Sequence, residues 1–109
     1  MNTVSIIGRI TKDLELKSFN EGKGFYTRFT IAINRVSHKD SQPEADFINI
    51  VAWSGLAETI CKHLKKGSQL AVTGRLSSSS YTDKDGNKRY STEVVAEDFK
   101  FLDNKQQVV

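Results

Sequence analysis

Two aromatic residues, Phe47 and Trp53, are six positions apart in a segment with the alternation of a β-strand. Because strand side chains alternate between faces, both rings are expected on one face, with Asn49 and Val51 between them. A third aromatic, Tyr81, precedes a polar hairpin. Exposed rings in such an array can stack with unpaired nucleic-acid bases, each contributing about 1–3 kcal/mol. The pattern of Phe47 and Trp53 is equally compatible with packing in a core.

Basic side chains are interleaved with these rings along the sequence. A protein that binds single strands needs such groups to follow the phosphate backbone. Each of them, taken singly, could equally be a solvated surface charge. Only their interleaving with the aromatic residues indicates binding of single strands. The basic candidates are Arg9, Arg28, Arg35, Arg75, Lys84 and Lys88.

Residues with catalytic or metal-binding chemistry form no recognisable site. His38 and His63 are isolated, with no cysteine or carboxylate at the spacing of metal ligands. Cys61 falls on the apolar stripe of a predicted helix, and Asp83 and Asp85 belong to a predicted turn. The sequence contains no glycine-rich phosphate loop that opens a helix. It therefore predicts a binding protein and not an enzyme, with no metal, cofactor or small-molecule substrate.

Length and composition are those of one globular domain. The 109 residues suffice for a single core, and the net charge of +3 permits nucleic-acid binding without requiring it. The lone cysteine excludes an internal disulfide. The sequence has no apolar run long enough to span a membrane and no signal-peptide pattern at its start, so a cytoplasmic protein without membrane contact is expected.

The elements that position the candidates are mostly strands. The clearest alternation is at 25–34, where Thr27, Phe29 and Ile31 share one face while Tyr26 and Arg28 lie on the other, wettable face. Helix signals follow Trp53: a cap at Ser54, an apolar stripe, lysines at 65 and 66 in the last turn, and a stop at Gly67. The predicted strands are 3–10, 25–34, 46–53, 69–81 and 89–98.

Five mostly antiparallel strands with a helix between the third and fourth are typical of an all-β OB fold, a five-stranded antiparallel barrel. We expect this domain at 1–102, followed by a short frayed tail at 103–109. The expected core includes Ile48 and Ile50 of the third strand and the aromatic residues Phe25, Phe29, Phe99 and Phe101.

Several motifs in order resemble the bacterial single-stranded DNA-binding protein family. They are IGRITKD at 7–13, FTIAINR at 29–35, ADFIN at 45–49, LKKGS at 64–68, GRL at 74–76, DGN at 85–87 and TEV at 92–94. The resemblance implies an OB-fold protomer, usually of a homotetramer, that binds single-stranded DNA with little sequence preference in replication, recombination or repair. It implies stacking on Phe47, Trp53 and Tyr81, and a DNA path lined by Arg9, Arg28, Arg35, Lys66 and Arg75.

An alternative is an OB-fold protein-interaction module of a replication complex. In either case residues 3–7 are a plausible edge for pairing between subunits.

The sequence departs from the family pattern at three places. Many members have an aromatic residue where this chain has Val36-Ser37-His38, so one stacking platform is expected to be missing unless His38 replaces it. Serines at 77–80 replace basic residues, which predicts weaker and less salt-sensitive binding. The chain ends without the family's acidic tail, so we expect a short form that does not recruit tail-dependent partners.

Overall fold

The computed structural model describes residues 1–19, 21–35 and 44–102, and folds this part of the chain into six strands and one helix. The predicted loop around His38 and the predicted tail at 103–109 lie outside the described residues. The elements are β1 (Val4–Ile10), β2 (Lys17–Phe19), β3 (Gly24–Asn34), β4 (Ala45–Trp53), α1 (Ser54–His63), β5 (Gln69–Thr82) and β6 (Lys88–Phe101).

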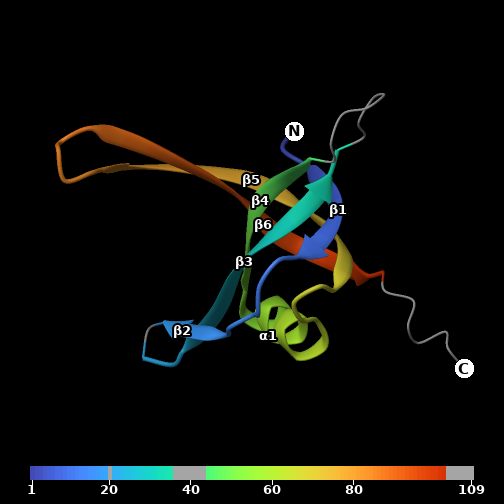
Figure 1. Ribbon diagram of the computed structural model, residues 1–109. Helices are drawn as coiled ribbons and strands as arrows, with labels where there is room; N and C mark the ends of the chain where they lie inside the picture. Colours follow the sequence, from blue (N-terminus) through green and yellow to red (C-terminus); the bar gives the residue numbers. More distant parts are fainter. Residues whose placement is uncertain (20, 36–43, 103–109) are drawn as a thin grey trace, which may run out of the picture.

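Five of the strands close into a ring in the order β1-β5-β6-β4-β3, because β1 also pairs with β3 (Figure 1). These five are the strands that the sequence predicted. The pairings are antiparallel except that of β4 with β6, which is parallel, so the strands are mostly antiparallel as predicted. The short β2, which pairs with the outer edge of β3, was missed because three residues are too few to show an alternation.

The core lies inside the ring and follows from the alternation of its strands. Thr27, Phe29 and Ile31 of β3 are buried, as predicted, and Ile50 is buried beside them on β4. One face of α1 covers one end of this core through residues that recur three to four positions apart (Figure 1). These residues are Ala57 and Ile60 of α1 and Leu64, which directly follows the helix.

The four aromatic residues expected in the core are not equally buried. Phe29 is 2% exposed, and Phe99 packs partly buried against the core. Phe25 is half-buried. The prediction is wrong for Phe101, which is 40% exposed because it is the last residue of β6.

Both predicted ends of the helix need correction. Trp53, not Ser54, is the N-cap residue, and no side chain makes a capping hydrogen bond there. Ser54 is instead the first residue of α1, and its φ of +57° lies in the left-handed region. The helix ends at His63, so Lys66 and Gly67 belong to the turn that follows. This turn is anchored to the end of β1, since the Gly67 amide donates to the Ile10 carbonyl oxygen at 2.8 Å.

Two glycines allow strands of the ring to approach closely. A Cβ atom at Gly8 of β1 would lie 2.7 Å from the Ala32 carbonyl oxygen of β3, where the ring closes. At Gly74 of β5 a Cβ atom would overlap the Val95 carbonyl oxygen of β6. The β5–β6 register shifts at this second point, between Thr73 and Gly74. Ring closure therefore depends on the absence of a side chain at Gly8, and the register irregularity depends on its absence at Gly74.

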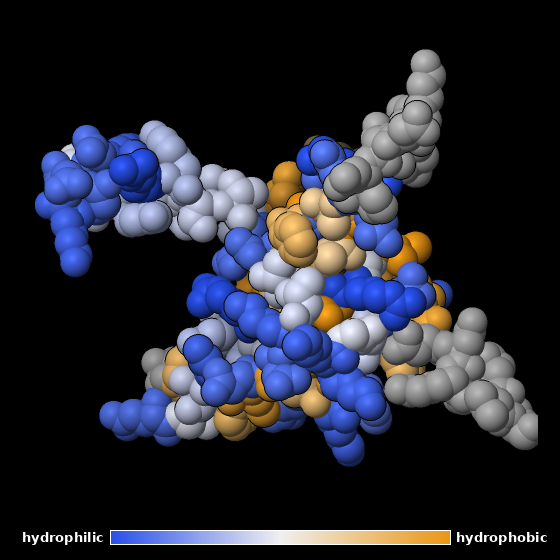
Figure 2. Space-filling view, in the orientation of Figure 1, coloured by the Kyte–Doolittle hydropathy of each residue, from blue (hydrophilic) through white to orange (hydrophobic). Residues whose placement is uncertain are grey.

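Beyond the ring, β5 and β6 continue as a two-stranded arm that projects away from the rest of the molecule (Figure 1). The face of this arm that is visible in Figure 2 is hydrophilic to the tip. The tip is ordered by Asp83, whose carboxylate accepts hydrogen bonds from the amides of Asp85 and Asn87 at 3.0 and 2.9 Å and from Arg89 Nε at 2.7 Å. The Arg89 hydrogen bond is the main cause that lowers the pKa of Asp83. The acidic residues here are turn residues, as expected.

Thr27 offers a test of the core. Its Oγ1 atom is buried and has no hydrogen-bond partner within the described part of the chain. Thr27→Val keeps the shape and removes the unsatisfied hydroxyl, so we expect the free energy of unfolding to rise by about 1 kcal/mol. Urea denaturation followed by Trp53 fluorescence measures this change. Thr27→Ser, which keeps the hydroxyl but loses the methyl group, should lower the stability. A less stable valine variant would show that the hydroxyl is satisfied in solution.

Candidate nucleic-acid interface

The outer faces of β3 and β4 form one continuous surface built from directly opposed residues. Phe47 is 66% exposed and Trp53 is 40% exposed on this surface. Core packing is therefore excluded for both rings, whereas their contact with DNA stays a prediction. The opposed pairs are Tyr26 with Trp53, Arg28 with Val51, Thr30 with Asn49, and Ala32 with Phe47.

Trp53 belongs to a cluster of three rings that the sequence analysis missed. Its ring centroid lies 5.3 Å from that of Tyr26 and 5.5 Å from that of Phe19. The Arg28 guanidinium carbon lies 5.4 Å from the Tyr26 centroid, within cation–π range. Phe19 lies over Gly24, where a Cβ atom would collide with the Phe19 ring in its present position. The sequence contains a signal for Tyr26, because the alternation at 25–34 places Tyr26 on the same outer face of β3 as Arg28.

Tyr81 lies on the arm and is 57% exposed. Ser79 is two positions earlier in β5, so Tyr81 and Ser79 lie on the same face of the strand. Ser79 also borders a hollow in the surface. Tyr90, which the sequence analysis did not select, is 69% exposed and lies on the opposite face of the arm, across from Ser80. The Lys88 ammonium nitrogen is 5.8 Å from the Tyr90 ring centroid.

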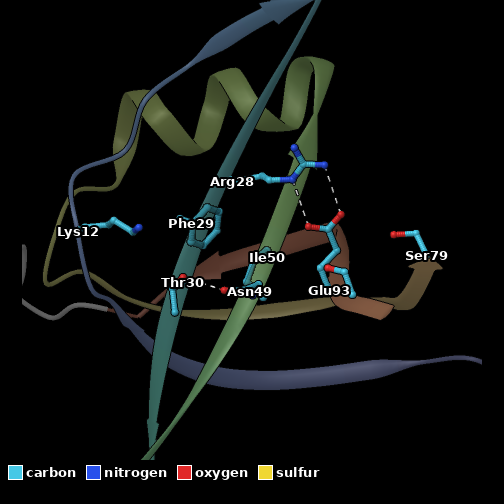
Figure 3. Close-up of a pocket in the computed structure, with 9 residues that line it drawn as sticks. Lys12, Arg28, Phe29, Thr30, Asn49, Ile50, Ser79 and Glu93 are labelled. Carbon is cyan, nitrogen blue, oxygen red and sulfur yellow. Dashed lines mark hydrogen bonds and ion pairs between the residues drawn. The ribbon is translucent and has the colours of Figure 1, made fainter. Parts of the chain in front are cut away.

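Between β3, β4 and the base of the arm the surface is hollowed, with a volume of about 360 Å³. Figure 3 shows Lys12 on one side and Ser79 on the other, with Arg28, Glu93 and Asn49 between them. The hollow thus links the surface that carries Phe47 and Trp53 to the arm that carries Tyr81. Its lining consists of Lys12, Arg28, Phe29, Thr30, Asn49, Ile50, Ser79, Ser91 and Glu93.

Three of the predicted arginines are paired with carboxylates. Arg28 Nε lies 3.2 Å from Glu93, and Arg75 Nε lies 3.6 Å from Glu97. Arg28 and Arg75 are at the two ends of a row of neighbouring residues that runs across β3, β4, β6 and β5, with Val51 and Val95 between them. Val51 is buried although it lies on the outer face, which fits coverage by the long apolar stems of such arginines.

Arg35 lies just beyond β3, at the Phe47 end of the surface. Its Nη2 atom is 2.7 Å from Asp46, and its Nη1 atom is 2.9 Å from Glu44. The hydrogen bond from Arg35 lowers the pKa of Asp46, and the same contact raises the pKa of Arg35. Its charge is therefore already balanced by two acids.

The remaining basic candidates fall into two groups. Arg9 is opposite Ala32, which is opposite Phe47, so Arg9 shares the outer surface. Its Nη1 atom donates to the Gly67 carbonyl oxygen at 2.9 Å, which places it beside the turn that carries Lys66. Lys84 and Lys88 lie instead at the tip of the arm, beyond Tyr81.

A closed five-stranded ring with a helix between its third and fourth strands, in chain order, defines the OB-fold class. Exposed aromatic rings among basic groups on one face of such a ring are typical of its nucleic-acid-binding members. Within the described residues, α1 is too short and polar to cross a membrane, and no three histidine, cysteine or acidic side chains form a metal site.

Comparison with known proteins specifies the class further. Residues 1–102 match the model of the single-strand binding protein family, and the chain belongs to this family. A single-stranded DNA-binding protein of Clostridium tetani is 48% identical over 97% of this chain and 74% of that protein. One from Clostridium perfringens is 49% identical over 95% of this chain and 67% of that protein. Single-stranded DNA-binding protein 1 of Clostridium acetobutylicum is 41% identical over the full length of both. The predicted OB fold and the prediction of a binding protein rather than an enzyme are confirmed.

Proposed function

We propose that this protein binds single-stranded DNA with little sequence preference. Bases stack on Phe47, Trp53 and Tyr81, and the basic residues along the face and arm meet the phosphates. The observation that carries the proposal is the exposure of all three rings on one connected surface with basic neighbours. Sequence tolerance follows because every base has a π face.

The cellular role that fits this activity is protection of single strands during replication, recombination or repair, in the cytoplasm at the nucleoid. The family and its bacterial relatives support this role. We infer residues 1–102 as the DNA-binding domain, which is the range that matches the family.

Trp53 fluorescence provides the direct test, because this residue is the only tryptophan. Titration with oligo-dT at low salt should quench the emission strongly if a base stacks on the indole. Tight binding without quenching would contradict the role of Trp53. Absence of binding at low salt would favour the alternative of an OB-fold module that acts through protein contacts.

We infer in addition that the protein works as a homo-oligomer, a tetramer by analogy with its family. Along one edge β1 pairs with β5 from Val4 to Arg9, but along the other it pairs with β3 only at Arg9 and Ile10. Among the described residues, the first part of β1 therefore has an open edge, and the Ile7 side chain there is 54% exposed. Native mass with and without oligo-dT tests this inference, and a monomer under both conditions would contradict it.

The serines of β5 lead to a prediction about salt dependence. Ser77 and Ser79 are on the same face of β5 as Tyr81, and Ser79 borders the hollow. In the variant Ser77→Arg, Ser79→Arg, the log–log salt slope of binding should steepen by about 0.7 for each new arginine that meets a phosphate. The larger share is expected from position 79, because Ser77 is opposite Glu93.

The matched control places the same two charges on the other side of the arm. Ser78→Arg, Ser80→Arg adds arginines that face away from Tyr81, so the slope should change less. Equal slopes for both double variants would show that this face of the arm does not track the DNA backbone.

A further inference from the structure

The hollow contains an acidic residue on a surface proposed to receive a polyanion. The Glu93 carboxylate accepts hydrogen bonds from Arg28 Nε at 3.2 Å and from Arg28 Nη2 at 3.5 Å. Its side chain is 25% exposed, so the carboxylate is partly enclosed in the hollow. A carboxylate repels phosphate, which makes Glu93 a poor residue for a pure backbone-binding surface.

Donors and acceptors in the hollow are fixed before any ligand arrives. The Glu93 carboxylate can only accept hydrogen bonds, and the adjacent Arg28 guanidinium can only donate them. Thr30 Oγ1 donates to Asn49 Oδ1 at 3.0 Å, which leaves the Asn49 amide nitrogen as the donor of that side chain (Figure 3). The hollow therefore presents an acceptor beside donors, with Phe29 and Ile50 also in its lining.

This arrangement matches the edge of a nucleobase rather than a phosphate. A volume of about 360 Å³ lies within the range of small-molecule sites and has room for one base. Acidic side chains on nucleic-acid-binding surfaces accept from base amino groups, and arginines donate to base carbonyl oxygens.

We propose that the hollow takes one base of the bound strand and that Glu93 makes it favour guanine over thymine. The Watson–Crick edge of guanine presents two adjacent N–H donors, at N1 and N2, which suit the two oxygens of one carboxylate. Its O6 atom is then an acceptor for Arg28. Thymine has a single N–H between two carbonyl oxygens, and one of these would face the carboxylate. The inference rests on the proposed binding of single-stranded DNA, to which it adds a preference at one position.

The test compares oligo-dT with the same oligonucleotide containing one central dG, with both affinities measured by fluorescence anisotropy of the labelled strand. The guanine oligonucleotide should bind about fivefold more tightly to the wild type, the lower end for one bidentate contact, since the hollow is open to solvent. Replacement of dG by deoxyinosine, which lacks the N2 amino group, should remove most of the gain.

Glu93→Gln should abolish the preference, because an amide offers one acceptor and its NH₂ group suits thymine equally well. Glu97→Gln is the matched control: it also removes one negative charge and one arginine partner from β6, but lies outside the hollow. This control should keep the fivefold preference.

Each outcome has a definite meaning. Equal affinity of the wild type for both oligonucleotides overturns the inference while leaving the proposed function intact. Binding to neither at low salt defeats the proposed function itself. If Glu93→Gln changes both affinities by the same factor and keeps the preference, Glu93 is only the counter-ion of Arg28, and base selection is refuted. The deoxyinosine comparison in the wild type decides the matter even if the variant fails to fold.

Discussion

Removal of both rings of β4 in the double variant Phe47→Ala, Trp53→Ala is expected to weaken binding to oligo-dT at least about 30-fold. Each stacked base contributes about 1–3 kcal/mol, so two platforms together account for at least about 2 kcal/mol. The two positions are about 20 Å apart along the strand, at about 3.3 Å per residue. Their effects should therefore be additive. Fluorescence anisotropy of a labelled oligonucleotide measures the loss without relying on the tryptophan.

The single variants separate binding from folding. Phe47 is the more exposed ring, so Phe47→Ala should lose affinity at unchanged stability. Trp53→Ala also removes contacts with Tyr26 and Phe19, whereas Trp53→Phe keeps an aromatic face and should retain most of the affinity. Tyr90→Ala, which removes an equally exposed ring from the opposite face of the arm, should leave binding unchanged. If Tyr90→Ala loses as much affinity for oligo-dT as Phe47→Ala, the DNA path is not confined to the surface that carries Phe47 and Trp53.

The largest effect on stability is expected at Gly74. A Cβ atom there would overlap the Val95 carbonyl oxygen, which is backbone and cannot turn aside. Gly74→Ala must therefore push β5 and β6 apart at the register shift, and we expect a loss of about 3 kcal/mol or more in the free energy of unfolding. Urea denaturation followed by circular dichroism measures the loss.

Gly55 provides the control for this substitution. It is the second residue of α1, and a Cβ atom there meets nothing within 4 Å. Gly55→Ala should leave the stability unchanged or raise it by up to about 1 kcal/mol, because alanine is the better helix former. Equal stability of the Gly55 and Gly74 variants would show that the strands adapt at the bulge.

The same part of β5 also positions the proposed binding surface. Gly74 is followed directly by Arg75, which ends the row that crosses Val95 and Val51 to Arg28. A shift of β5 against β6 would displace this row and the hollow beside it. A Gly74→Ala protein that still folds is therefore expected to bind DNA more weakly than the wild type, although its aromatic residues Phe47, Trp53 and Tyr81 are unchanged.

The sequence determined the strands of the ring, the helix and the faces on which their side chains lie, because these depend on local alternation. The pattern at 25–34 predicted the buried face of β3 and its wettable face with Arg28. The spacing of Phe47 and Trp53 predicted that they share a face. Whether that face was buried or exposed stayed open, because a period of two does not say which side another element covers.

Only the tertiary structure decided which residues meet across that face. β2 brings Phe19 to Trp53, and β6 brings Glu93 to Arg28, from positions 34 and 65 residues apart in the chain. Such contacts depend on ring closure and strand register, to which no local pattern corresponds. The sequence by itself thus determined that Phe47, Trp53 and basic residues could bind DNA. The fold decided that the surface carrying them adjoins a hollow in which Arg28 is already paired with Glu93.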